Sequence, residues 1–230
     1  MRALLLFALI LSGAVPAAAE TRGFGVSGFD RIRVEGPYKV RLATNVAPFA
    51  TASGSAAALQ RLAIRVDGRT LIIQSDLSGW GGYPGKDNGA VQINVGTHDL
   101  STAILVGAGS LAIDRVKGLE FALTVQGAGI AGIDQADVDQ LKVAVSGTGG
   151  VRLGGKARQL SAIVRGMANL QAADLSVKDA TIAVEGAGTV AATISNTATV
   201  TSSGSGSVAL GGNPACTVKV TGAASVTGCR

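Results

Sequence analysis

Residues 105–113, 125–133 and 145–153 read LVGAGSLAI, VQGAGIAGI and VSGTGGVRL, and they are three of seven copies of one short pattern. Each copy has a glycine and a second small residue two positions later, and in nearly every copy an apolar residue follows four positions after the glycine. The first glycines lie 18–20 residues apart and are Gly107, Gly127, Gly147, Gly166, Gly186, Gly204 and Gly222. A repeat of this length is typical of a solenoid in which each copy forms one coil.

The runs between these glycines indicate strands. Residues 141–145 and 181–184, LKVAV and TIAV, alternate in polarity and contain β-branched residues. The helical half and asparagine ladder of a leucine-rich repeat are absent, as is the calcium-binding nonapeptide pattern. The sequence therefore predicts an all-β, parallel β-helix whose coils stack about 4.8 Å apart. Small residues at the Gly-x-Gly corners let successive backbones stack without a conflict between Cβ atoms.

The composition fits this architecture. Glycine occurs 33 times without the three-residue period of collagen, and aromatic residues make up 3% of the chain. Because hydrophobic residues reach 47%, intrinsic disorder is disfavoured. We expect an interior of Val, Leu, Ile and Ala that is too narrow for large aromatic side chains. One histidine and two cysteines leave few ligands for a metal centre of those residues, and we expect no cofactor and no metal.

Residues 20–99 differ from the repeat at 100–230 and are expected to form strand-rich entry coils or a cap, continuous with the repeat as one domain. Alternation predicts strands at 29–34, 38–42, 62–66 and 71–73. Asp67-Gly68 indicates a hairpin between the last two strands. A short helical turn is expected at 56–61 and a long loop at 79–89. The open end of a solenoid needs such a cover.

The first nineteen residues have the pattern of a secretory signal peptide. Arg2 supplies a positive start, residues 3–11 form an apolar run, and Ala17–Ala19 provide a small-residue cleavage site near Ala19. The run is too short for a membrane span, and no later segment is long and apolar enough to form a transmembrane helix. We therefore expect an exported protein of the periplasm or the cell surface.

Export explains the two cysteines. Cys216 and Cys229 lie thirteen residues apart, and an oxidising compartment favours a disulfide between them. The bridge would stop the terminal segment from fraying and contribute about 2–3 kcal/mol. A redox pair is disfavoured because the C-x-x-C spacing is missing.

Two classes of ligand fit the sequence poorly. The net charge is +5, but the basic residues are scattered along predicted strands, whereas nucleic-acid binding uses clustered Lys and Arg with stacking aromatics. The Gly-x-Gly units precede strand-like runs rather than helices, which disfavours phosphate-binding loops for nucleotides. We expect no nucleic-acid partner.

One set of carboxylates has a notable spacing. Asp114 and Asp134 should stack on adjacent coils, Gly154 takes the equivalent place on the next, and Asp174 follows one coil later. The ladder favours either a cation or sugar site or the ordinary use of Asp at corners, where it bonds its own backbone. If the carboxylates met in a cleft, the chain would instead be a polysaccharide lyase or hydrolase, because that chemistry needs converging carboxylates.

Two further candidates stand outside the repeat. His98 precedes Asp99, but Ser101 and Ser110 lack the sequence of a nucleophile elbow, so a surface histidine is preferred and no catalytic residue is assigned. Trp80 and Tyr83 lie on the glycine-rich loop, where they either contact a sugar or protein ligand or cover the solenoid end.

The order of these features resembles a known family. The opening FDRIRVEG at 29–36, DG at 67–68 with LII at 71–73, the serial Gly-x-Gly units and VALGGNP at 208–214 follow one another. This series resembles the bacterial envelope family called "putative auto-transporter adhesin, head GIN domain", over nearly all of residues 24–228. The resemblance implies a right-handed β-helical domain with an adhesin-like role, and it brings no catalytic residues.

We therefore predict a non-catalytic, exported envelope protein. It is expected to be adhesin-like, or a scaffold or binding module, and to present a solenoid surface to an envelope protein or glycan. The alternative is a polysaccharide-active enzyme that uses the carboxylate ladder.

Overall fold

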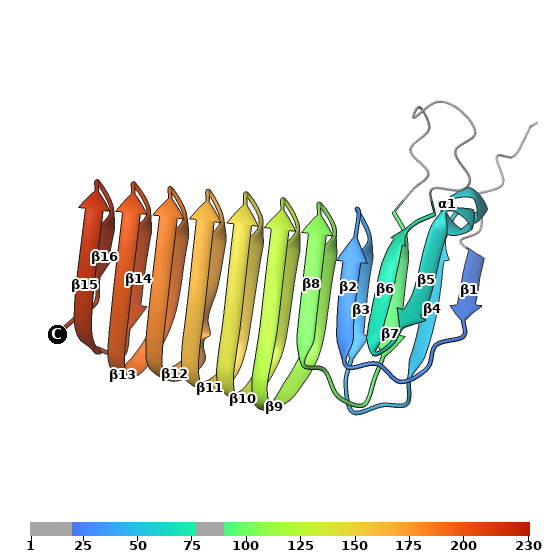
Figure 1. Ribbon diagram of the computed structural model, residues 1–230, viewed down its shortest axis with the longest axis horizontal. Coiled ribbons are helices and arrows are strands. Elements are labelled where there is room, and N and C mark those ends of the chain that lie inside the picture. The colour runs from blue at the N-terminus through green and yellow to red at the C-terminus, as the bar shows by residue number, and fades with distance from the viewer. Residues whose placement is uncertain (1–19, 77–89) are drawn as a thin grey trace, which may run out of the picture.

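The computed structural model describes residues 20–76 and 90–230. The predicted signal peptide and the loop that carries Trp80 and Tyr83 lie outside these residues. The described chain is almost entirely strand and forms one elongated stack of coils (Figure 1).

The repeat region forms the parallel β-solenoid that the glycine pattern predicts. Its strands are β8 (Thr102–Gly107), β9 (Ser110–Gly127), β10 (Ile130–Gly147), β11 (Gly150–Gly166), β12 (Asn169–Gly186), β13 (Thr189–Gly204), β14 (Ser207–Gly211), β15 (Ala215–Gly222) and β16 (Ser225–Thr227). Strands β9 to β13 pair in parallel in chain order. The first glycines face one another across the pairings, as Gly107 faces Gly127 and Gly127 faces Gly147. The expected coil length of 18–20 residues is confirmed.

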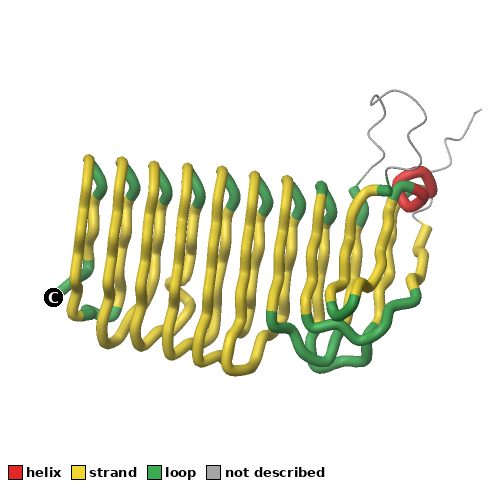
Figure 2. The backbone as a smooth tube through the Cα atoms, viewed as in Figure 1, coloured by secondary structure: helices red, strands yellow, loops and turns green. Residues whose placement is uncertain are grey.

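Each coil has two different turns, which we call the tight corner and the bend. The tight corner is the Gly-x-Gly unit between successive strands, and the bend lies within each long strand, opposite the corner. In Figure 2 the corners are the short green segments along the upper edge, and the bends form the lower edge. Pairing shifts register at the bend, between Ile133 and Ala136 and between Arg152 and Gly154. Changes in coil length are therefore absorbed at the bend.

The entry region continues the stack and then covers it. Its elements are β1 (Glu20–Phe24), β2 (Arg31–Glu35), β3 (Lys39–Ala43), β4 (Phe49–Gly54), α1 (Ala56–Gln60), β5 (Leu62–Asp67), β6 (Thr70–Ser75) and β7 (Gln92–Gly96). Strands β2 and β3 pair in parallel with β8 and β9. Beyond them, β4 runs antiparallel to β7 and to β1. The stack thus changes from parallel to antiparallel pairing at this end.

Two local predictions for the entry region are confirmed. Strands β5 and β6 form an antiparallel hairpin, and Gly68 has φ +59° in its turn, a conformation that glycine adopts without a Cβ penalty. Helix α1 occupies the predicted helical turn, and the Ser55 side chain caps it by accepting a hydrogen bond from the Ala58 amide.

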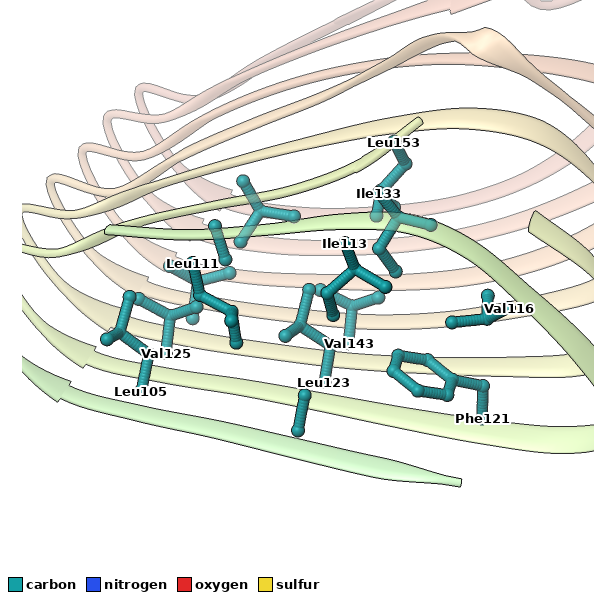
Figure 3. Packing of buried hydrophobic residues seen from close by; sticks show 14 of the residues in the cluster. Leu105, Leu111, Ile113, Val116, Phe121, Leu123, Val125, Ile133, Val143 and Leu153 are labelled. Carbon is teal, nitrogen blue, oxygen red and sulfur yellow. The ribbon is translucent and has the colours of Figure 1, made fainter. Parts of the chain in front are cut away.

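The core runs through the middle of the stack, because alternate residues of each strand point inward. Leu111, Ile113, Leu123 and Val125 are buried there (Figure 3). The expectation that large aromatics do not fit is wrong in the repeat at Phe121, and Phe29 and Tyr38 are also buried in the entry region. Phe121 has no exposed surface, and it lies beside Val116 at the bend, where the interior is wide enough for a ring.

The C-terminal coil carries the predicted disulfide. Cys216 and Cys229 are bonded, with their Cα atoms 5.6 Å apart. The closed loop contains Gly222, the last of the seven first glycines. Within residues 20–76 and 90–230, no helix is long and apolar enough to cross a membrane.

Candidate functional site

The tight corners are backbone contacts between coils. The seven first glycines have φ between +88° and +112°. A Cβ atom added to Gly147 would lie 2.4 Å from the Gly127 carbonyl oxygen, and one added to Gly127 would lie 2.8 Å from the Gly107 oxygen. These same oxygens accept hydrogen bonds from Thr148 and Ala128 at 3.0 Å. The corners are thus filled by the chain itself, and their role is structural.

Two carboxylates of the predicted ladder, Asp114 and Asp174, have different partners. Asp114 Oδ1 accepts hydrogen bonds from two main-chain amides, that of Thr44 at 3.0 Å and that of the neighbouring Arg115 at 2.5 Å. Asp174 forms an ion pair of 2.9 Å with Arg152. Asp114 thus bonds backbone amides, which is the ordinary use of Asp at a turn.

The gap in that ladder has a backbone cause. A Cβ atom at Gly154 would lie 2.6 Å from the Asp134 carbonyl oxygen, so the chain passes too close there for a side chain. Among residues 20–76 and 90–230, no group of three or more His, Cys, Asp and Glu side chains is placed to hold a metal ion.

His98 is exposed, and its carbonyl oxygen accepts a hydrogen bond from the Asn45 amide at 2.9 Å. The Ser101 hydroxyl donates to the Asp30 carbonyl oxygen at 3.0 Å. The Ser110 amide donates to the Tyr38 carbonyl oxygen at 2.8 Å. Both serines are therefore engaged with backbone of the entry region.

A large hollow in the described surface follows the bend. It has a volume of about 740 Å³ and is lined by residues 117–119, 137–139, 156–158 and 176–178 together with Thr193 and Ser195. We call it the bend groove. Strand register stacks the first residues of these triplets, since Asp137 pairs with Lys117 and with Lys156, which pairs with Ser176. The groove therefore runs along the solenoid axis across five coils.

The groove has an uncharged middle row between two rows that are mostly polar or charged. The middle row is Gly118, Val138, Ala157 and Val177, and the last three are buried. One flanking row is Lys117, Asp137, Lys156 and Ser176, and the other is Leu119, Asp139, Arg158 and Lys178. Leu119 is 79% exposed, which is unusual for a leucine and adds apolar surface at one end.

Acidic side chains in the groove are neutralised by neighbours on the next coil. Lys156 Nζ lies 3.3 Å from an Asp137 oxygen, and an Arg158 guanidinium nitrogen lies 3.6 Å from an Asp139 oxygen. By contrast, Lys117 and Lys178 form no ion pair within the described chain. The groove thus carries a positive excess, located on its first and fourth coils.

Two smaller hollows extend the groove onto the adjoining strand face. One, of about 270 Å³, shares Leu119, Asp139 and Arg158 with the bend groove. The other, of about 340 Å³, shares Gln140 and Gln159 with the first. Gln140 Nε2 donates to Gln159 Oε1 at 3.2 Å. Together the three form one continuous depression.

Asp179, in the third hollow, is held as a carboxylate. It accepts hydrogen bonds from the Thr197 hydroxyl at 2.5 Å and from the Asn196 amide at 2.7 Å. The Thr197 bond, with smaller contributions from Asn196 and the charge of Lys178, lowers the pKa of Asp179 below its usual range.

The bend groove is the candidate site that sequence reasoning missed. Its triplets read KGL, DVD, KAR and SVK, and no position has one residue type in all four coils. The available signal was register: each triplet begins 9 or 10 residues after a first glycine, so the four triplets stack when the glycines are aligned, and the stack contains six charges. Trp80 and Tyr83, the predicted binding residues, lie outside the described chain.

Comparison with protein families gives one match. The model of the family described as "Putative auto-transporter adhesin, head GIN domain" matches residues 28–214. Among curated proteins, no relative matches.

Three solved structures with the same fold come from Bacteroides and Parabacteroides. A "putative adhesin" from Bacteroides fragilis is 17% identical, with a TM-score of 0.80 over 91% of this chain and 96% of its own. A "putative lipid binding protein" from Parabacteroides distasonis is also 17% identical, with a TM-score of 0.74 over 92% and 98%. A "putative adhesin" from Parabacteroides merdae is 16% identical, with a TM-score of 0.67 over 92% and 96%. At these identities the likeness shows the fold.

Proposed function

This chain belongs to the auto-transporter adhesin, head GIN domain family, and we propose that it is an exported, non-catalytic binding module of the bacterial envelope. Its ligand lies lengthwise in the bend groove. The observation that carries this proposal is the continuous depression along the bend, whose main part spans five coils and about 740 Å³. A volume of this size is typical of ligand sites.

Three further features support the proposal. The disulfide between Cys216 and Cys229 fits an oxidising, extracytoplasmic location. Two solved proteins with a similar fold are described by the words "adhesin" and "lipid binding", and both words denote binding roles. The tight corners repeat one residue type, whereas the bend varies from coil to coil, as expected if the scaffold is separate from the binding surface.

The enzyme alternative has no comparable support among the described residues. Lyase or hydrolase chemistry needs carboxylates that converge on a substrate. Asp114 is bonded to backbone amides, Asp174 is paired with Arg152, and neither lines the bend groove.

The test blocks the groove with a bulky side chain. Ser176 is exposed and lines the groove, so Ser176→Trp fills it, whereas Ser207→Trp places the same group on an exposed strand residue outside all three hollows. The exported chain is titrated with polygalacturonate, dextran and phosphatidylglycerol vesicles by calorimetry and co-sedimentation. We expect at least one probe to bind and Ser176→Trp alone to weaken it. Equal binding by both variants contradicts the proposal.

A further inference from the structure

We propose that the ligand of the bend groove is a linear acidic polysaccharide, such as a chain of uronic acids. This inference rests on the proposed function and specifies its ligand. It follows from the placement of charge, the shape of the lining and the hydrogen-bonding groups beside it.

The first argument is the position of the unpaired cations. Lys117 lies on the β9 coil and Lys178 on the β12 coil, three coil steps away. At about 4.8 Å for each step, they are separated by roughly 14 Å along the axis. A ligand that lies in the groove and meets both lysines therefore carries negative charge at more than one place along its length. A linear polyanion satisfies this requirement, and a single headgroup does not.

The second argument concerns the acids that a polyanion would approach. Asp137 and Asp139 are each paired with a cation, at 3.3 and 3.6 Å. Glu120, in the adjoining hollow, lies 2.7 Å from Lys142 Nζ. Asp179, next to Lys178, already accepts hydrogen bonds from Thr197 and Asn196. The acids that line the bend groove itself are thus paired with cations, so Lys117 and Lys178 supply its positive excess, whereas Asp179 keeps its negative charge beside Lys178 and lies outside that groove.

The third argument is the chemistry of the lining. The exposed Leu119 side chain and the neighbouring Gly118 offer an uncharged surface for the C–H faces of sugar rings, above the buried Val138, Ala157 and Val177. The Gln140–Gln159 pair leaves an acceptor oxygen on Gln140 and donor N–H groups on Gln159, which suit hydroxyl groups. Charged side chains flank the uncharged row on both sides, which is a poor environment for acyl chains.

Two other polyanions fit less well. Single-stranded nucleic acid needs aromatic platforms on which its bases stack, and no aromatic residue lines the bend groove or the adjoining hollows. An acidic lipid presents one charged group and needs burial of its chains. The observations therefore favour the polysaccharide.

The test compares probes and charge variants of the exported chain. Polygalacturonate is the acidic probe, dextran the neutral one, and phosphatidylglycerol vesicles are the lipid surface. The double variant Lys117→Gln/Lys178→Gln removes the unpaired cations. Lys39→Gln/Lys219→Gln removes the same charge from exposed strand residues outside all three hollows, and so controls for non-specific attraction.

We expect polygalacturonate to bind more tightly than dextran or the vesicles. Removal of Lys117 and Lys178 should weaken this binding about tenfold, because two charge-assisted contacts are lost, and the control double variant should change it less than about twofold. Binding should also weaken with added salt, since exposed charges are screened.

The failures of the two proposals are distinguishable. If dextran or vesicles bind best and Ser176→Trp blocks them, the groove is a binding site but the polysaccharide inference is overturned. If polygalacturonate binds equally to both lysine double variants, the inference is also overturned. If neither Ser176→Trp nor Lys117→Gln/Lys178→Gln changes the binding of any probe, both the polysaccharide inference and the proposed function are contradicted.

Discussion

The two turns of each coil follow different rules. At the tight corners, glycine carbonyl groups and hydrogen bonds join neighbouring coils, and a side chain on Gly147 would come within 2.4 Å of backbone. At the bend, the triplets KGL, DVD, KAR and SVK occupy equivalent positions without a common residue type. The comparison shows where this fold tolerates variation: residue type is fixed where backbones meet and is free where side chains face solvent.

The largest expected effect comes from a side chain at a tight corner. Gly147→Val combines a φ of +110° with a backbone clash and should lower the free energy of unfolding by about 4 kcal/mol. Gly132→Val is the matched control, because a Cβ atom there meets only the Arg152 carbonyl oxygen at 4.0 Å. That variant should stay within about 0.5 kcal/mol of the parent. Urea unfolding followed by circular dichroism measures both, and equal midpoints would refute the role given to the corners.

The second largest effect concerns two residues of the bend that lie two positions apart in sequence. Phe121 is completely buried, so Phe121→Ala should cost about 3–4 kcal/mol. Leu119 is 79% exposed, so Leu119→Ala should change stability by less than about 0.5 kcal/mol. Thermal unfolding of the two variants separates the core side of the bend from its surface side. A similar loss in both would mean that Leu119 is part of the core.

The third effect concerns the last tight corner. Gly222 lies within the loop closed by Cys216 and Cys229, so Cys216→Ser/Cys229→Ser should lower stability by about 2–3 kcal/mol. Hydrogen exchange of residues 215–227 should accelerate, with the central coils unaffected. Reductant should reproduce this effect in the parent and add nothing in the variant. Exchange that is unchanged in both would show that the corner needs no bridge.

The smallest effect is a pH dependence at the edge of the bend region. The Thr197 hydrogen bond lowers the pKa of Asp179, so this carboxylate stabilises the fold above its unfolded pKa of about 4. The stabilisation is lost as the pH falls below about 4 and through the lower folded pKa. Asp179→Asn should therefore flatten the decline of the melting temperature with acidity in this range. A decline identical to that of the parent would contradict this assignment.

The same contrast explains what the sequence predicted. The corners recur as Gly-x-Gly because backbone geometry selects the residue, and the coil length, parallel pairing and hairpin at Gly68 follow from such local rules. The bend groove has no residue common to all its coils, so it becomes visible only when the coils are stacked. The partner of Asp114, Thr44, lies 70 residues away in sequence, and no local pattern predicts that contact. Phe121 is buried beside Val116 at the bend. The low aromatic content of the chain is an average over all residues, so it could not predict this single position.

The central claim is that the bend binds the ligand and that the tight corners hold the coils together. An amide NMR titration of the protein with polygalacturonate tests it most directly. The account predicts that shifts concentrate at residues 117–119, 137–139, 156–158 and 176–178, while amides at Ala128, Thr148 and Ala187 stay unchanged. Shifts that gather at the tight corners, or that spread evenly over both strand faces, would contradict it.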